Sequence, residues 1–203
     1  MDKNKINICI GLLSNRGFKG KTVLSLLKMV AEGGFDFHFA FIDSGYTIAE
    51  NRNYLAVQAV KNECDYLLMV DDDMIFPPDT LNILISREKD IIGVPYNVKV
   101  APKNGENVRQ RNNVTYFPTN ELTPIDTSTD PVEVIAIGAG VMLVKVEVFK
   151  KLSQPFFGFD SYDNGMTKVG EDSWFCYKAT KSGYKIWCER TLEGLGHIGD
   201  FIY

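Results

Sequence analysis

Apolar, strand-like runs alternate with helix-like segments over the first 94 residues, and this alternation constrains the fold most strongly. The runs are short and rich in β-branched residues, whereas the segments between them carry apolar residues at helical spacing. The expected strands are residues 6–13, 37–42, 66–70 and 91–94, and the expected helices are 23–30, 47–60 and 77–85. Such alternation favours a parallel sheet with helices on both faces. The sequence therefore predicts an α/β fold with a Rossmann-like, mostly parallel central sheet.

The pattern changes in the second half of the chain. Residues 97–131 are polar and rich in Asn, Thr, Pro and Lys, which indicates a long loop, with a hairpin expected around residues 114–117. Long loops in compact domains are usually functional or mobile. Regular structure is expected again as two strand-like runs in 132–144, helices over 146–152 and 171–181, and a strand over 184–188. No linker or repeat interrupts the chain, so we expect one domain over residues 1–203.

Three adjacent aspartates, Asp71-Asp72-Asp73, directly follow the apolar run 66–70. Their carboxylates repel one another and destabilise the fold unless a positive charge lies beside them. Open α/β sheets bind ligands at the carboxyl ends of their strands, and carboxylate oxygens suit Mg²⁺ or Mn²⁺. Because side chains alternate along a strand, Asp71 and Asp73 are expected to point to one side and Asp72 away. The triplet predicts a divalent-metal site; the alternative is a solvated acidic turn before the next helix.

Composition narrows the classes of function and location. The net charge is −4 and no basic face is evident, so nothing favours a nucleic-acid partner. The four cysteines are scattered without a CxxC pair, which indicates reduced, buried thiols and a cytoplasmic location. No apolar stretch reaches the length of a transmembrane helix, and the N-terminus does not resemble a signal peptide.

Two residues of the first half are candidates for contacts with a bound nucleotide. Arg52 lies at the edge of the apolar face of its helix, where a guanidinium needs an anion, either one of the aspartates or a ligand phosphate. Asp43 follows the strand 37–42, at the same edge of the sheet as Asp71. Its carboxylate could bind a ribose hydroxyl or the N–H of a base, although Asp43-Ser44-Gly45 is also typical of a turn.

Further candidates lie in the second half. Glu171 and Asp172 open a helix, where a carboxylate stays ionised and could act as a general base, or could simply complement the helix dipole. Gly138 and Gly140 would let the backbone approach a ligand closely, unless they form a bulge between strands. His197 lies between glycines near the C-terminus and is a candidate metal ligand that would favour Mn²⁺; a structural histidine is the alternative.

An alternative function comes from the segment Gly20-Lys21-Thr22, which opens a helix after the first strand and loop. This order resembles a P-loop, so a small-molecule kinase or NTPase is a rival interpretation. A P-loop requires glycine five positions before Gly20, because that turn wraps backbone N–H groups around phosphate. Asn15 occupies the position. The mismatch weakens the kinase interpretation, and helix-start chemistry explains Lys21 and Thr22 equally well.

Taken together, these motifs resemble those of the family 2 glycosyltransferases and their GT-A relatives over nearly the whole chain. The segments that carry the resemblance are Ile48-Ala49-Glu50-Asn51-Arg52-Asn53, the strand 66–73 with its DxD motif and Pro78-Asp79, the glycine strand 137–143, Gly170-Glu171-Asp172, and His197. The loop after the first strand departs from the family pattern, and the family's C-terminal extension does not follow His197. The resemblance implies a single-domain GT-A fold with a smaller antiparallel part. It divides the chain into a nucleotide-binding half, 1–95, and an acceptor and catalytic half, 132–203, on either side of the variable loop 97–131.

The resemblance also implies roles for residues. Asp73 and His197 would ligate Mn²⁺ or Mg²⁺, and Asp71 would contact the ribose or the metal shell. Asp172, with Glu171 beside it, would be the base of an inverting transfer. The donor would be a nucleotide-diphosphate sugar, with a UDP-sugar favoured, and the acceptor a saccharide, a lipid-linked molecule or a protein. A homodimer could complete the acceptor site, and a non-catalytic nucleotide-sugar binder is a further alternative.

Overall fold

The computed structural model describes residues 5–14, 17–42, 46–97, 113–115, 130–163 and 167–199. The strands are β1 (Asn7–Leu13), β2 (Asp36–Ile42), β3 (Tyr66–Asp71), β4 (Met74–Ile75), β5 (Ile91–Gly93), β6 (Val114–Thr115), β7 (Val132–Val134), β8 (Ala136–Ile137), β9 (Val141–Lys145), β10 (Asp160–Ser161), β11 (Thr167–Val169), β12 (Ile186–Cys188) and β13 (Gly196–His197). The helices are α1 (Gly20–Glu32), α2 (Ile48–Lys61), α3 (Thr80–Ser86), α4 (Val146–Lys151) and α5 (Glu171–Lys181). The strands and helices expected in the first half are therefore present, with shifts of a few residues at their ends.

The central sheet has seven strands in the order β2-β1-β3-β9-β5-β12-β7. β1 runs parallel to both β2 and β3, and β12 runs parallel to β5. β9 is antiparallel to β3 on one side and to β5 on the other, so β3 and β5 share one direction. β7 is antiparallel to β12 at the far edge. The expected α/β class with a mostly parallel sheet is confirmed, and β9 from the second half of the chain is inserted between strands of the first half.

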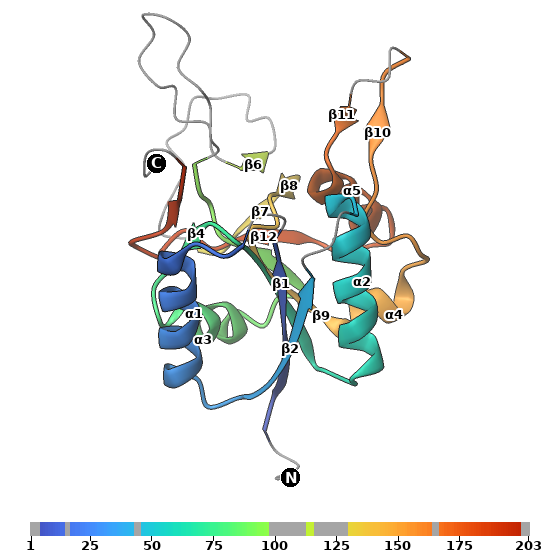
Figure 1. The fold of residues 1–203 in the computed structure, drawn as a ribbon. Helices are drawn as coiled ribbons and strands as arrows, with labels where there is room; N and C mark the ends of the chain where they lie inside the picture. Colours follow the sequence, from blue (N-terminus) through green and yellow to red (C-terminus); the bar gives the residue numbers. More distant parts are fainter. Residues whose placement is uncertain are drawn as a thin grey trace, which may run out of the picture.

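Helices cover both faces of the sheet, as the alternation predicted. Figure 1 shows α1 and α3 on one side of the sheet and α2, α4 and α5 on the other. The core is divided in the same way: Cys9 packs in the cluster that contains Leu55 of α2, while Ile8 and Ile10 pack in the cluster that contains Leu26 of α1. A strand buried on both faces reads as a continuous apolar run, which explains why β1 and β3 lack a polar alternation.

Three small antiparallel pairings surround this core. β6 pairs with β8 and β13 pairs with β4. Val114 and Thr115 pair with β8, while residues 116–117 lie outside the described segments, so the hairpin expected around residues 114–117 stays a prediction. β10 and β11 form a hairpin that was not expected and that rises beside α5 (Figure 1). These pairings carry the antiparallel part of the fold.

The capping and cysteine expectations are both met. Thr47 and Glu50 form the capping box that begins α2: the Glu50 N–H donates to Thr47 Oγ1, and the Thr47 N–H donates to Glu50 Oε2. All four cysteines are free and buried. Within the described segments, no helix is long and apolar enough to cross a membrane.

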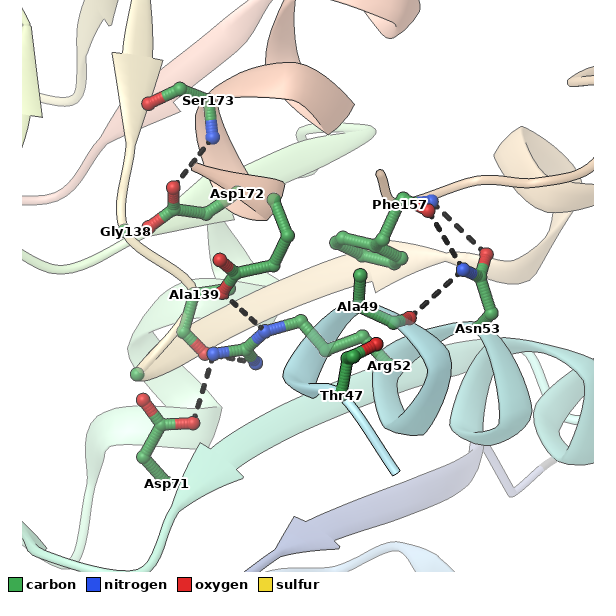
Figure 2. Close-up of polar contacts among 12 residues, drawn as sticks. Thr47, Ala49, Arg52, Asn53, Asp71, Gly138, Ala139, Phe157, Asp172 and Ser173 are labelled. Carbon is green, nitrogen blue, oxygen red and sulfur yellow. Dashed lines mark hydrogen bonds and ion pairs between the residues drawn. The ribbon is translucent and has the colours of Figure 1, made fainter. Parts of the chain in front are cut away.

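The side chain of Asn53 joins α2 to the loop that follows α4. Its Nδ2 donates to the carbonyls of Ala49 and Phe157, both at 2.8 Å, and its Oδ1 accepts from the N–H groups of Phe156 and Phe157 (Figure 2). The backbone groups of the loop therefore find their partner in a side chain that is 103 or more positions distant in the sequence. Asn53, the residue that follows Arg52, thus holds Phe156 and Phe157 against α2.

We expect Asn53→Ala to lower the free energy of unfolding by about 2 kcal/mol or more, because it leaves several loop backbone groups without their partner. Denaturant unfolding measures the loss. The matched control is Asn62→Ala, since the exposed Asn62 side chain donates only to the Gln58 carbonyl within its own helix. We expect the control to change stability by about 0.5 kcal/mol or less. Equal losses in the two variants would contradict the role of Asn53.

Candidate functional site

A cleft of about 270 Å³ opens at the carboxyl ends of β1 and β3. Its walls come from the end of β1, the start of α2, the aspartate triplet after β3, and β13; the lining residues are Leu13, Ser14, Ile48, Asp71, Asp72, Asp73 and His197. This is the sheet edge at which open α/β folds bind ligands. The structure therefore brings together the triplet and His197, which are 124 or more positions apart in the sequence.

Asp72 holds the turn against the loop that follows β1. The Ser14 hydroxyl donates to Asp72 Oδ2 at 2.6 Å. The Asp72 carbonyl accepts from the Lys19 N–H at 2.9 Å and from the Thr22 hydroxyl at 3.0 Å. Thr22 is fully buried and is used in this contact. The segment Gly20-Lys21-Thr22 therefore starts a helix and supports Asp72, which gives the P-loop interpretation no support.

Arg52 is the most deeply buried charged side chain of the site, with 2% of its surface exposed. Its Nη2 donates to Asp71 Oδ1 at 3.0 Å, its Nε to Glu171 Oε1 at 3.2 Å, and its Nη1 to the Ala139 carbonyl at 3.1 Å (Figure 2). The anion that Arg52 was expected to need is thus a pair of carboxylates of the protein. We call Arg52, Asp71, Glu171 and the Ala139 carbonyl the Arg52 network.

The two carboxylates at the start of α5 have different surroundings. Glu171 is buried, and burial raises the pKa of its carboxyl, opposed by the nearby charge of Arg52. Asp172 is half-buried, and its Oδ1 accepts from the N–H of Ser173 at 2.6 Å. Glu171 Oε1 accepts from Arg52 Nε, whereas Figure 2 shows Asp172 directed toward Ser173. The pair therefore separates into one carboxylate committed to the Arg52 network and one at the surface of the first helical turn.

Gly138 and Gly140 make room for Tyr96, a residue that the sequence did not single out. A Cβ atom at either glycine would lie 2.6 Å from the Tyr96 hydroxyl oxygen. That oxygen accepts from the Gly140 N–H at 3.0 Å, and the Gly140 carbonyl accepts from the Asp71 N–H at 2.9 Å. Burial raises the pKa of Tyr96, and the nearby Asp71 raises it further. The two glycines therefore accommodate Tyr96, which follows the end of β5 at this same edge of the sheet, and their expected approach to a ligand stays a prediction.

His197 reaches the triplet through strand pairing. β13 pairs with β4, which places His197 opposite Met74, and the Ile198 N–H donates to the Asp73 carbonyl at 2.7 Å. The His197 Nε2 atom lies 3.1 Å from Asp73 Oδ1, and Nδ1 lies 3.0 Å from the Asn97 carbonyl oxygen. Both ring nitrogens therefore face acceptors.

This geometry fits a cation between His197 and Asp73. If Nδ1 donates to the Asn97 carbonyl, a neutral ring presents a lone pair at Nε2 to the carboxylate, which is unfavourable. A proton or a divalent metal at Nε2 removes the repulsion, and metal-binding histidines are commonly held by a backbone carbonyl in this manner. One imidazole and one carboxylate suit Mn²⁺. Among the described residues no group of three or more His, Cys, Asp or Glu side chains is arranged for a metal.

One predicted site residue cannot be placed. Asp43 lies outside the described residues, so its expected contact with a ribose or base stays a prediction. Ser14 and Asn97 were not predicted as site residues, although both lie just beyond the ends of strands at the carboxyl edge of the sheet. That position, together with a polar side chain or an exposed backbone carbonyl, is the signal that could have indicated them.

Comparisons with known proteins show likeness of fold without close likeness of sequence. No protein-family model matches the chain, and no curated protein matches it. The chain is similar to the solved structure of A197 from STIV, with a TM-score of 0.60, 14% identity, and coverage of 97% of this chain and 86% of that one. It is also similar to GalNAc-T7 with UDP, GalNAc and Mn²⁺, with a TM-score of 0.53 and 16% identity over 98% of this chain. The match covers 45% of the GalNAc-T7 chain, so this chain spans less than half of that protein.

A third solved structure is a putative nucleotide-diphospho-sugar transferase from Desulfovibrio desulfuricans G20. Its TM-score is 0.50, with 9% identity and coverage of 92% of this chain and 80% of that one. At such identities the likeness concerns the fold. The chain therefore has a GT-A-like fold, as the motifs predicted.

The Arg52 network generates a prediction about stability and pH. Arg52→Met leaves two carboxylates beside an apolar chain, and we expect a loss of about 3–5 kcal/mol at neutral pH. Glu171 already has a raised pKa in the folded state, so its ionisation disfavours folding as pH rises above the ordinary glutamate range. Removing Arg52 raises that pKa further, so the loss should shrink as pH falls towards the range in which Glu171 is protonated.

Urea unfolding of both proteins in acidic and in neutral buffer measures this difference. Lys145→Met is the matched control, because it breaks the half-exposed pair between Lys145 and Asp90. We expect the control to lose about 1 kcal/mol or less at neutral pH. A loss in Arg52→Met that is the same in acidic and neutral buffer would contradict the proposed electrostatic cause.

Proposed function

We propose that the chain is a metal-dependent glycosyltransferase that moves a sugar from a nucleotide-diphosphate donor, with a UDP-sugar favoured, to an acceptor hydroxyl. The observation that carries the proposal is the cleft in which Asp73 and His197 face each other beside Asp71, at the carboxyl edge of a GT-A-like sheet. The similarity to GalNAc-T7, a structure that contains UDP, GalNAc and Mn²⁺, supports this choice of donor and metal.

The donor would lie in the cleft with its diphosphate towards Asp73 and His197. These two side chains would hold Mn²⁺ or Mg²⁺, and the chemistry supplied by a bound cation is neutralisation of the charge on the departing diphosphate. Asp71 lines the same cleft, and its Oδ1 is fixed by Arg52 Nη2. A carboxylate with a fixed orientation is suited to a ribose hydroxyl or to a water of the metal shell. Arg52 would therefore support donor binding through Asp71 and would not touch the donor.

Asp172 is the proposed general base. A carboxylate at the start of a helix is stabilised as an anion, which suits a group that must take a proton from an acceptor hydroxyl. The acceptor oxygen would attack the anomeric carbon as the bond to the diphosphate breaks, and the configuration would invert. Glu171 is unsuited to this step, because it is buried and bonded to Arg52. Its role is to position the first turn of α5.

Incubation with Mn²⁺ and a panel of nucleotide sugars, with and without acceptors, tests the proposal. Release of a nucleoside diphosphate supports sugar transfer or donor hydrolysis. Release of pyrophosphate on addition of a nucleoside triphosphate and a sugar phosphate would instead indicate a nucleotidyltransferase. Hydrolysis of ATP that depends on Lys21 would indicate the P-loop alternative. Tight donor binding with no turnover by any of these assays would indicate a non-catalytic binder.

We expect Asp172→Asn to lower kcat for transfer by roughly 10²- to 10⁴-fold, because the amide cannot accept the proton. Donor and metal binding, measured by calorimetry, should stay nearly unchanged. Asp79→Asn is the matched control, since Asp79 is an exposed aspartate that precedes α3 and makes no side-chain cap bond. Preserved transfer with weakened donor binding in Asp172→Asn would exclude the role of base.

We expect His197→Ala to raise the Mn²⁺ concentration needed for half-maximal donor hydrolysis by about tenfold or more, because one of two protein ligands is lost. The matched control is His38→Ala, which removes the other histidine of the chain, exposed on β2. An unchanged Mn²⁺ titration in His197→Ala would show that the imidazole does not hold the metal.

A further inference from the structure

A second, larger concavity of about 510 Å³ lies beside α5. Its floor and walls come from the outer face of α5, the strands β7 and β8, and the β10–β11 hairpin, and we call it the α5 groove. Trp174, Tyr177 and Thr180 line it at intervals of three residues, so they form one row along the helix. The residues between them, such as Phe175 and Ala179, are buried in the core. The helix thus presents an aromatic row to the groove and its apolar row to the sheet.

The lining of the groove is aromatic and partly exposed. Tyr177 is 62% exposed and Ile135, on the opposite wall, is 39% exposed. The Trp174 ring packs over the backbone of Gly158, where a Cβ atom would lie 3.3 Å from the ring, so the ring is held in place. Rigid aromatic faces in a concave surface of this size are typical of ligand sites, and sugar rings present C–H faces that stack on them.

The four charged residues that line the groove form two ion pairs, while Lys178 and Lys181, which do not line it, lie over the Trp174 and Tyr177 rings at 5.1 and 5.4 Å from the ring centroids. Lys185 Nζ lies 2.7 Å from Glu133 Oε2, and Lys168 Nζ lies 3.7 Å from Asp160 Oδ2. All four side chains line the groove, so the two cations there are each paired with a carboxylate of the same wall. A phosphate or carboxylate ligand would have to break these pairs. The electrostatics therefore favour an uncharged ligand whose hydroxyl groups can share bonds with the charged rim.

The groove is lined by the two residues that follow the proposed base in the sequence. Ser173 and Trp174 line it, and Ser173 directly follows Asp172 and bonds to its carboxylate. On the other side of the same helical turn, Glu171 is joined through Arg52 to Asp71, which lines the donor cleft. Asp172 thus lies on the first turn of α5, next to Ser173, which lines the groove, and next to Glu171, which is joined through Arg52 to the cleft residue Asp71.

We propose that the α5 groove binds an uncharged saccharide chain, and that this saccharide is the acceptor whose hydroxyl is presented to Asp172. The acceptor role rests on the proposed function; saccharide binding in the groove does not. Stacking on Trp174 and Tyr177 would supply affinity, and the paired charges of the lining would give an anionic glycan no unpaired cation on the groove wall.

Isothermal titration calorimetry with maltohexaose, cellohexaose and xylohexaose tests binding in the absence of donor. We expect at least one of them to bind, and Tyr177→Ala and Trp174→Ala each to weaken its binding by roughly tenfold. Tyr54→Ala is the matched control, because Tyr54 is an exposed tyrosine on α2 that does not line the groove. The control should bind the saccharide as the unaltered protein does.

Three outcomes would overturn the groove proposal: none of the three saccharides binds, binding is insensitive to both variants, or phosphatidylcholine vesicles bind instead and lose binding with Tyr177→Ala. A second measurement distinguishes a failure of the groove proposal from a failure of the proposed function. It is the release of nucleoside diphosphate from the nucleotide-sugar panel by the unaltered protein. Donor turnover with saccharide binding insensitive to Tyr177→Ala would refute the groove alone. Groove-dependent saccharide binding without any donor turnover would refute the transferase and leave a saccharide-binding site.

Discussion

The guanidinium of Arg52 connects four parts of the chain that meet at the carboxyl edge of the sheet. It comes from α2 and bonds to Asp71 at the end of β3, to the carbonyl of Ala139 in the turn between β8 and β9, and to Glu171 at the start of α5. A charge this deeply buried is tolerated only when its donors are matched by acceptors. The positions of β3, of the β8–β9 turn and of α5 are therefore interdependent, and the network joins Asp71, which lines the cleft, to the start of α5, where Ser173 and Trp174 line the α5 groove.

The network also explains why two adjacent carboxylates can have separate roles. Successive residues of an α-helix differ in direction by about 100°. Once Glu171 is directed into the interior by its bond to Arg52, Asp172 must be directed away from that bond. Its half-buried carboxylate receives the Ser173 N–H and remains at the helix start, where an anion is stabilised. The buried pair thus fixes the direction of the neighbour that is proposed as the general base.

Much of the fold could be predicted from the sequence because its signals are local. The apolar runs of β1 and β3, the helical spacing after Val23 and the capping box at Thr47 each depend on residues within a few positions. The site was harder to predict because its contacts are distant: Arg52 and Glu171 are 119 positions apart, and the sequence left open whether the anion would be an aspartate or a phosphate. Tyr96 was missed because nothing local distinguishes it, whereas the glycines that accommodate it were noticed. The two-residue strand β13 has no periodicity that sequence could reveal.

In the aspartate triplet, contacts with other residues of the protein offset the repulsion among the three carboxylates. Each carboxylate has its own partner: Asp71 has Arg52, Asp72 has the hydroxyl of Ser14, and Asp73 has His197. These partners are not equivalent with respect to a metal. Displacing Arg52 from Asp71 would leave a buried guanidinium one acceptor short, and displacing Ser14 from Asp72 would loosen the turn. A cation held by Asp73 and His197, as the proposed function requires, would leave both of these contacts intact. The first two members of the triplet therefore keep the edge of the sheet in place, while the third is the member proposed to hold a metal.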